Sequence, residues 1–371
     1  MLFLREIELK TFRCFEQKKL RFHKKISLII GDNGTGKSSL IEAIHYLCYM
    51  KSFRNAQSID LIERTSQSFF LKAHMESDND EHHAIQVGYA AKQKMIKVNN
   101  QNIKSYKELF SMFQVITLHE EDIHMVKGSP AERRTFLDNA ALLLSSQYID
   151  TYRAFKKILQ QRNALLSAPY QQPLEMDIWT ERLFKASREI QALRADILKL
   201  VEQKIQDLIT RYFHAVYTVT FAYEAVAIEP DEKWDTFILK NQPLFEREKL
   251  TRRSLFGAHL DNFTIMINGA PARFFASRGQ QKLIALLCKL ALIPLAAQKA
   301  FNPVLLVDDF IADFDAVRLK ELISFFADCQ NQIIITTPLY DAELQKIMQS
   351  VDPDVISMNQ DLTIEKILKK I

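Results

Sequence analysis

Residues 25–41, KISLIIGDNGTGKSSLI, decide the fold. A short apolar run from Lys25 to Ile30 leads into a loop with three glycines, and apolar residues recur at helical spacing from Ser38 onward. The loop fits the pattern G-x-x-x-x-G-K-[ST], and it stands after a strand and before a helix, as a phosphate-binding loop requires. Small residues let successive backbone N–H groups surround phosphate oxygens, and the helix N-terminus adds positive potential. The stretch predicts an α/β ATPase.

The loop also assigns roles to its residues. Lys37 should reach the β- and γ-phosphates, and the Ser38 hydroxyl should bind Mg²⁺. The chain has only 8 glycines in 371 residues, which makes a plain glycine-rich turn an unconvincing alternative. The expected cofactors are therefore ATP and Mg²⁺. The residues expected to hold the nucleotide are Gly31, Asp32, Asn33, Gly34, Thr35, Gly36, Lys37, Ser38 and Ser39.

The second element of such a site is a strand that ends in acidic residues. Val304 to Val307 is apolar and is followed by Asp308 and Asp309. Asp308 should hold Mg²⁺ through water, and Asp309 should polarise the attacking water, so Asp309 and Lys37 are the expected catalytic residues. Two carboxylates after a strand could instead cap a helix. Their pairing with a phosphate loop favours the metal site.

A third segment has the placement of an ABC-type signature. Ser277-Arg278-Gly279-Gln280-Gln281-Lys282 lies just before an apolar helix and upstream of the acidic strand. In ABC-type ATPases the serine hydroxyl and the glycine amide contact the γ-phosphate held by the opposite subunit, so Ser277, Gly279 and Gln280 are expected to bind nucleotide. A chain with one loop and one signature must then dimerise head to tail. An ordinary helix N-cap is the alternative.

The middle of the chain is helical in pattern, with no glycine between Gly128 and Gly257. A helix is predicted over Tyr148 to Ser167, then a proline-bearing connection at 168–173, then an apolar stripe from Trp179 to Tyr212 at steps of three and four. The pattern indicates an inserted helical arm, although simple helix packing would give the same stripe.

Strands and helices alternate again near the C-terminus. Helices are predicted over 280–299 and 317–329, and strands over 304–307 and 332–336, which resumes the parallel sheet begun near Ile30. Alternation between 69 and 98 predicts antiparallel strands. The predicted architecture is an ABC-type, SMC-head-like P-loop fold with mixed parallel and antiparallel sheets and an inserted helical arm. Its parts are 1–138 (first part of the ATPase core), 139–250 (arm) and 251–371 (second part of the core).

Composition sets the remaining limits. The apolar runs 283–287 and 290–297 are each far shorter than the ~20 residues that span a bilayer, and the N-terminus does not have the pattern of a signal peptide, so a cytoplasmic protein without a membrane partner is expected. The four cysteines are scattered, which favours reduced thiols over disulfides or a metal site. The net charge of +4 is too small to indicate a nucleic-acid partner by itself.

Several segments together resemble the RecF family of bacterial DNA replication and repair ATPases, which is related to the heads of SMC proteins. The resemblance extends to about Thr337, and the 125–138 segment is its most specific part because generic ABC ATPases lack it. The segments that carry it are 9–13 (LKTFR), the phosphate loop with 41–44 (IEAI), 52–54 (SFR), 125–138 (MVKGSPAERRTFLD) and 277–282 (SRGQQK).

The resemblance implies an ATP-dependent DNA-binding protein that works with RecO and RecR to load RecA at gapped, single-strand/duplex junctions. ATP closes a homodimer on DNA, and slow hydrolysis, as a weak DNA-dependent ATPase, releases it. Basic clusters are candidate DNA contacts, with a solvated surface as the alternative reading for each. A metabolic kinase on the same loop, or the nucleotide subunit of a transporter, are the competing functions. The DNA candidates are Arg133, Arg134, Arg153, Lys156 and Lys157.

The sequence also departs from the family's pattern. Arg278 stands at a usual glutamine of the signature, and Ala312 at the usual serine of the S-E-L-D motif. Three further departures fall within the 257–262 segment, at Ala258, Leu260 and Asn262. We expect these positions to affect hydrolysis and communication across the dimer rather than ATP binding.

Overall fold

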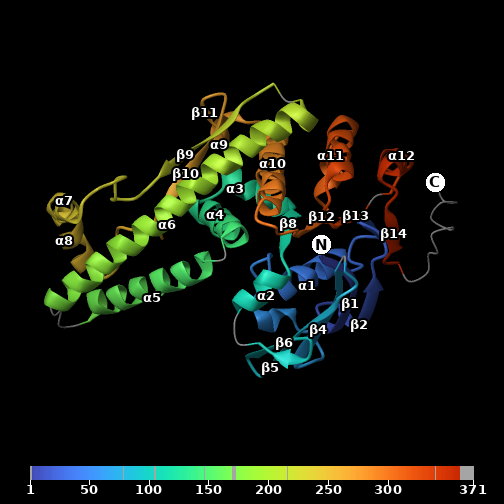
Figure 1. Ribbon diagram of the computed structural model, residues 1–371, viewed down its shortest axis with the longest axis horizontal. Helices are drawn as coiled ribbons and strands as arrows, with labels where there is room; N and C mark the ends of the chain where they lie inside the picture. Colours follow the sequence, from blue (N-terminus) through green and yellow to red (C-terminus); the bar gives the residue numbers. More distant parts are fainter. Residues whose placement is uncertain are drawn as a thin grey trace. The chain divides into compact units, whose positions relative to one another are not determined.

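The computed structural model describes residues 2–77, 79–103, 106–145, 147–168, 173–214, 216–338 and 340–359 (Figure 1). The chain divides into two compact units. The first takes its described residues from 1–122, 208–215 and 292–371, and the second from 123–207 and 216–291. The predicted parts, with boundaries at 138/139 and 250/251, divide the chain by function and stay a prediction. The boundaries between the compact units fall at other positions, near 122, 207, 215 and 291.

A five-stranded parallel sheet joins distant parts of the chain in the first unit. All residues of its three middle strands are buried, which is why these strands read as continuous apolar runs. Ile335 pairs with Leu28 on one side and with Val307 on the other, which confirms that the C-terminal strands resume the sheet begun near Ile30. The strand order is β14 (Asp354–Ser357), β3 (Ile26–Ile30), β13 (Ile333–Thr337), β12 (Val304–Asp308), β8 (Val115–His119).

An antiparallel sheet of six strands lies in the same unit. Its strands alternate as predicted: Leu71 and Ala73 are buried, whereas Lys72 and His74 are half-exposed. Helix α1 (Lys37–Tyr49) packs against this sheet and also contacts the parallel sheet. The mixture of parallel and antiparallel sheets is thus confirmed. The strand order is β2 (Phe15–Arg21), β1 (Leu2–Phe12), β4 (Ser68–Ser77), β5 (His82–Ala90), β6 (Gln93–Val98), β7 (Gln101–Asn102).

A π-helical turn, Ile209–Phe213, belongs to the first unit and packs against α11 (Ala316–Asp328). The rings of Tyr212 and Phe325 lie 5.4 Å apart, and Arg318 donates to the Phe213 carbonyl at 2.8 Å. The other short elements of the first unit are α2 (Tyr106–Met112), α12 (Ala342–Met348) and the 3-10 turns Ser58–Leu61, Phe310–Asp313 and Gln349–Val351. A further 3-10 turn, Glu120–Ile123, lies at the boundary between the two units in the sequence.

The second unit is mainly helical. Helix α5 spans Tyr148–Ser167, as predicted, and the stripe beginning at Trp179 lies on α6, which is 36 residues long (Pro173–Leu208). Residues 169–172 of the predicted connection lie outside the described residues. The other elements are α3 (His124–Lys127), α4 (Pro130–Leu144), β9 (Val219–Glu224), α7 (Trp234–Lys240), α8 (Gln242–Thr251), β10 (Asn262–Ile267), β11 (Ala270–Pro271), α9 (Ala272–Phe275) and α10 (Arg278–Ala297), which belongs to the first unit from Leu292 onward.

The helical arm has an apolar core of its own. Phe155 of α5, Leu183 of α6 and Phe237 of α7 are almost fully buried in one cluster. Beside it, the buried Arg162 donates to both carboxylate oxygens of Glu248, at 3.1 and 2.5 Å. The arm is therefore held by a packed core and a buried ion pair together.

Helix α10 contains a longer apolar stretch than either of the two apolar runs of the sequence taken separately. The two apolar runs, 283–287 and 290–297, form parts of one continuous helix of 20 residues, long and apolar enough by composition to cross a membrane. However, 78% of its most apolar window is buried inside the protein. A core helix of a folded domain has this character, because its apolar surface is covered by the protein itself.

Candidate nucleotide site

The phosphate loop lies between β3 and α1, where the sequence places it. Gly34 and Gly36 have positive φ angles of 87° and 94°. Lys37 is buried, and its Nζ donates to the carbonyls of Gly31 and Asp32 at 2.9 and 3.1 Å. The ammonium group is therefore held inside the curve of the loop, where phosphate oxygens bind in proteins of this class.

Two neighbouring segments pack on this loop. A Cβ atom at Gly36 would lie 2.4 Å from Cζ of Phe15 and 2.8 Å from Sγ of Cys14, so only glycine fits beneath the β1–β2 turn. On the other side, the Asn359 amide accepts from the Asp32 backbone N–H and donates to the Asp32 carboxylate, both at 3.2 Å. The loop is therefore braced by residues from both ends of the chain.

Asp308 ends β12 and is buried, with 8% of its surface exposed. The Thr336 hydroxyl donates to its carboxylate at 2.9 Å, and Ser38 also hydrogen-bonds to it. Burial raises the pKa of Asp308 to about 6, with the neighbouring charge of Asp309 acting in the same direction and the two hydroxyl hydrogen bonds opposing it. The structure thus brings together Ser38 and Asp308, the two residues expected to hold the metal.

Asp309 follows with a left-handed backbone, φ 48° and ψ 10°. Its N–H donates to the Thr336 hydroxyl at 3.0 Å, and its Oδ1 is buried without a hydrogen-bond partner among the described residues. A buried carboxylate oxygen without a donor is costly unless a cation or water satisfies it. A hydroxyl and two carboxylates are also the hard oxygen ligands that Mg²⁺ prefers, so these residues fit the metal that a phosphate loop uses.

The described residues contain no cluster of three or more histidine, cysteine, aspartate or glutamate side chains that could hold a metal ion. Mg²⁺ beside a nucleotide usually takes only one or two protein carboxylates and completes its shell with phosphate oxygens and water. All four cysteines are free thiols.

Glu42 is a part of this region to which the sequence analysis gave no role. Its carboxylate is fully buried in α1 and accepts from Nε and Nη2 of Arg13, at 2.7 and 2.8 Å. The Ser52 hydroxyl donates to the same carboxylate. Glu42 therefore ties the β1–β2 turn, which covers Gly36, to the segment after α1. The sequence carried two signals for it: Glu42 belongs to the 41–44 segment that resembles the family, and it is an acid between the apolar Ile41 and Ala43 on a helix.

The Ser52–Arg54 segment is held near the acidic strand. Phe53 packs between the rings of His45 and His119, at centroid distances of 5.4 and 4.8 Å, and the Arg54 N–H donates to the Ser52 hydroxyl at 2.9 Å. The positive charge of Arg54 opposes the rise in the pKa of Asp308. An exposed arginine beside these carboxylates is suited to a nucleotide's phosphates. The sequence marked this segment only as a family feature.

The signature-like segment lies in the second unit. Ser277 caps α10: its hydroxyl accepts from the Gln280 N–H at 3.2 Å, while the Gln280 side chain accepts from the Ser277 N–H at 2.8 Å. This reciprocal pair is a capping box. Ser277 and Gly279 are exposed, and nothing lies within 4 Å of a Cβ added at Gly279. The N-cap alternative is thus correct for Ser277, and the nucleotide roles of Ser277, Gly279 and Gln280 stay predictions.

The candidate DNA residues fall into two groups. Arg133 is buried and donates to Asn262 and to the Gly128 carbonyl, at 2.8 and 3.1 Å, and Arg134 donates to the Asp261 carbonyl at 2.8 Å. These two arginines hold the second unit together, and Arg133 offers little surface to a partner. By contrast, Arg153, Lys156 and Lys157 are exposed along α5.

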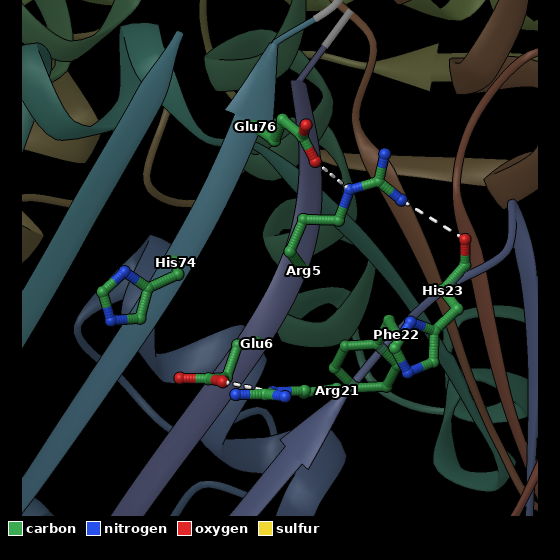
Figure 2. Close-up of a pocket in the computed structure, with 7 residues that line it drawn as sticks. All are labelled: Arg5, Glu6, Arg21, Phe22, His23, His74 and Glu76. Atoms are coloured by element: carbon green, nitrogen blue, oxygen red, sulfur yellow. Dashed lines mark hydrogen bonds and ion pairs between the residues drawn. The ribbon is translucent and has the colours of Figure 1, made fainter. Parts of the chain in front are cut away.

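A cavity of about 510 Å³ opens on the antiparallel sheet, away from any predicted site residue (Figure 2). It is lined by residues of β1, β2 and β4 and by the two residues that follow β2. Figure 2 shows two cations of this lining turned toward acids: Arg5 pairs with Glu76, and Arg21 pairs with Glu6 at 2.8 Å. Because these charges are already neutralised within the protein, the cavity carries no argument for an anion site.

Similarity to known proteins identifies the family to which this fold belongs. The model of the family described as RecF/RecN/SMC N terminal domain matches residues 3–354. Solved structures that are similar include the recombination mediator protein RecF with ATP in the RecFOR pathway, with a TM-score of 0.83 and 26% identity over 92% of this chain and 93% of that one. An Smc head domain from Pyrococcus furiosus has a TM-score of 0.57 at 16% identity, covering 100% of this chain and 98% of that chain, which shows the fold alone.

Curated relatives agree. The DNA replication and repair protein RecF of Tropheryma whipplei is 31% identical over 339 residues, covering 89% of this chain and 91% of the relative. That of Chlorobium luteolum is 28% identical over 359 residues, covering 94% and 96%. The match runs across both compact units and includes the phosphate loop and the acidic strand. The chain therefore belongs to the RecF/RecN/SMC family and, within it, to the RecF group of DNA replication and repair proteins.

Proposed function

We propose that this protein is an ATP-gated DNA-binding protein of gap repair, acting in the cytoplasm. ATP and Mg²⁺ bind at the phosphate loop, and ATP closes a head-to-tail homodimer on single-strand/duplex junctions. With RecO-like and RecR-like mediators it then promotes RecA loading. The observation that carries the proposal is the meeting of Ser38, Asp308 and Asp309 at the phosphate loop, with one buried Asp309 oxygen still lacking a partner.

In this proposal the residues have distinct tasks. Lys37 leaves its two backbone carbonyls to bind phosphate oxygens, while Ser38 and Asp308 hold Mg²⁺, which neutralises charge on the nucleotide. Asp309 positions the attacking water through its free carboxylate oxygen. Thr336 hydrogen-bonds to both acidic residues and so holds them in register. Hydrolysis is weak and DNA-dependent, because the site is complete only in the closed dimer.

DNA binding is assigned to the exposed cations of α5, Arg153, Lys156 and Lys157. Arg133 is left out of this surface because it is buried and paired within the protein. Each cation that meets a duplex phosphate releases counterions and adds about 0.9 to the slope of log affinity against log salt concentration. Replacing all three by alanine should lower that slope by up to about three.

Light scattering tests the proposal, with no nucleotide, ADP or ATP, each with and without a gapped duplex. The wild type should become a dimer only with ATP, and the gapped duplex should bind more tightly in that state than a blunt duplex. Lys37→Ala should abolish both effects, whereas Asp309→Asn should bind ATP, dimerise and hydrolyse far more slowly. A protein that turns over ATP as a monomer without DNA would instead be the metabolic kinase considered above.

A further inference from the structure

Helix α9 (Ala272–Phe275) presents two adjacent aromatic side chains to solvent. Phe274 is 76% exposed and Phe275 is 70% exposed. Phenylalanine is among the residues most often buried, and an adjacent exposed pair forms a patch rather than a scattered surface residue. Aromatic side chains that are exposed in one copy and held rigidly are typical anchors of protein interfaces.

The patch is held firmly against the signature-like segment. Ala272 is buried, and its carbonyl accepts from the Ala276 N–H at 3.1 Å. The Gln281 side chain, on the first turns of α10, donates to the Ala276 carbonyl at 3.1 Å and reaches the Arg273 carbonyl at 3.4 Å. Helix α9 and the start of α10 therefore form one hydrogen-bonded corner, so little conformational entropy is lost when the rings are buried.

Positive charge flanks the aromatic pair. The Arg273 guanidinium lies 5.6 Å from the centre of the Phe274 ring, and the exposed Arg278 follows Ser277 at the start of α10. The surface thus has apolar rings beside two arginines and the N-terminus of a 20-residue helix. A surface of this kind suits a partner that carries an apolar rim beside negatively charged phosphates.

We propose that Phe274 and Phe275 dock on a second copy of this chain, as the apolar rim of the composite ATP site. This inference rests on the proposed function, in which Ser277 meets the nucleotide held by the partner. Phe275 is two residues before Ser277, which is at most about 7 Å of chain. A dimer that brings the Ser277 hydroxyl to the partner's γ-phosphate therefore also brings the two rings to the partner's surface.

The test compares Phe274→Ser/Phe275→Ser with a matched control, Leu239→Ser/Leu250→Ser, which removes two equally exposed leucines, 77% and 84%, from α7 and α8. Binding of a fluorescent ATP analogue to the monomer is measured first and should be unchanged in both variants. The dimer dissociation constant with a non-hydrolysable ATP analogue is then measured by sedimentation. It should rise at least tenfold in the Phe variant and less than about twofold in the control, because burying a phenylalanine is worth more than a factor of ten.

Each outcome separates the two proposals. If the wild type does not dimerise with ATP, the proposed function fails. If the wild type and the Phe variant dimerise equally, the docking inference alone is overturned. Equal dimerisation with weakened single-stranded DNA binding would assign the rings to bases instead, which also overturns it. Phe274→Leu/Phe275→Leu should restore most of the dimer affinity, since the apolar area is kept.

A second measurement does not depend on the serine variant folding. In Phe275→Trp, the added tryptophan should show a blue-shifted emission on addition of the ATP analogue, relative to the wild type with its two native tryptophans. The shift should follow protein concentration through the dimer dissociation constant. An emission maximum that stays at the solvent-exposed value in the dimer would exclude burial of this position.

Discussion

Replacing Glu42 by glutamine should weaken the attachment of the two segments that Glu42 holds beside the phosphate loop, the β1–β2 turn and the segment after α1. The variant keeps the shape of the side chain but removes the charge that pairs with Arg13 through two hydrogen bonds of 2.7 and 2.8 Å. Glutamine also turns an N–H₂ group toward one of these donors, which leaves that donor unsatisfied. Because Glu42 also accepts from Ser52, both the β1–β2 turn and the Ser52–Arg54 segment lose their common anchor.

The magnitude follows from burial. Removing one partner of a buried ion pair costs about 3–5 kcal/mol, since the remaining charge is left uncompensated. The Glu42 side chain is fully buried, but a quarter of the Arg13 side chain is exposed, so water compensates part of the loss. We therefore expect the low end, about 3 kcal/mol, which corresponds to roughly a hundredfold change in a local opening equilibrium.

Hydrogen exchange measured by mass spectrometry gives a local readout. Global unfolding followed by tryptophan fluorescence would report on the wrong part, because Trp179 and Trp234 both lie in the second unit. In Glu42→Gln, peptides covering 11–16 and 50–55 should exchange roughly a hundredfold faster. Nucleotide affinity should fall too, since the β1–β2 turn rests on Gly36.

Glu8→Gln is the matched control, because Glu8 pairs in the same unit with Lys10, whose side chain is 49% exposed, and ion pairs with exposed partners are worth about 0–1 kcal/mol. It should change exchange by no more than a few fold. An equal effect in both variants, or a change of less than fivefold in Glu42→Gln, would show that the buried pair does not hold these segments. Combining Glu42→Gln with Arg13→Met should recover part of the loss, since it removes the unpaired charge.

Three further results are expected. Gly36→Ala should abolish nucleotide binding in a titration, because its Cβ would lie 2.4 Å from Phe15, whereas Gly269→Ala shares a positive φ but meets no atom within 4 Å and should cost only about 1 kcal/mol of stability. The pKa of Asp308 is about 6 in the folded protein and near its ordinary 3.8 in the unfolded chain, so the folded state binds the proton more tightly. This proton adds to the free energy of unfolding fully below pH about 4, and the added stability is lost as the pH rises through 6. Mg²⁺-dependent ATP affinity needs the carboxylate and should fall about tenfold per pH unit below 6; a flat profile from pH 5 to 8 would contradict this. Arg162→Ala should lower the free energy of unfolding of the second unit by about 3–5 kcal/mol, measured by urea unfolding followed by tryptophan fluorescence. The control is Lys185→Ala, which removes an exposed ion pair with Glu181 and should change that free energy by no more than about 0.5 kcal/mol.

The elements that the sequence predicted best are those whose pattern is set by burial alone. Strands β3, β12 and β13 are buried throughout, so their apolar runs and following loops were sufficient. Strands β8 (Val115–His119) and β14 (Asp354–Ser357) were not predicted. Strand β8 is as long as these three but neither follows nor leads into a recognisable motif, and β14 is only half-buried, so the places of both in the sheet depend on neighbours far along the chain.

In the candidate site, too, the residues of local motifs were predicted, whereas the contacts between distant parts of the chain were not. The phosphate loop and the acidic strand were predictable because their residues act close to where a local motif places them. Arg133 was grouped with basic surface clusters, but its partner Asn262 lies 129 residues further along, so its burial could not be seen locally. The pairing of Arg13 with Glu42, and the bridge from Thr336 to both acids, likewise depend on contacts between separate elements.

The contact between Asn359 and Asp32 has a practical consequence for handling the protein. Two hydrogen bonds connect the last described residue to the wall of the phosphate loop, 327 positions earlier in the sequence. Shortening the chain before Asn359, or attaching an affinity tag close behind it, is therefore a modification of the nucleotide site itself. Nucleotide affinities measured on C-terminally altered versions should be compared with those of a protein tagged elsewhere before they are attributed to the native chain.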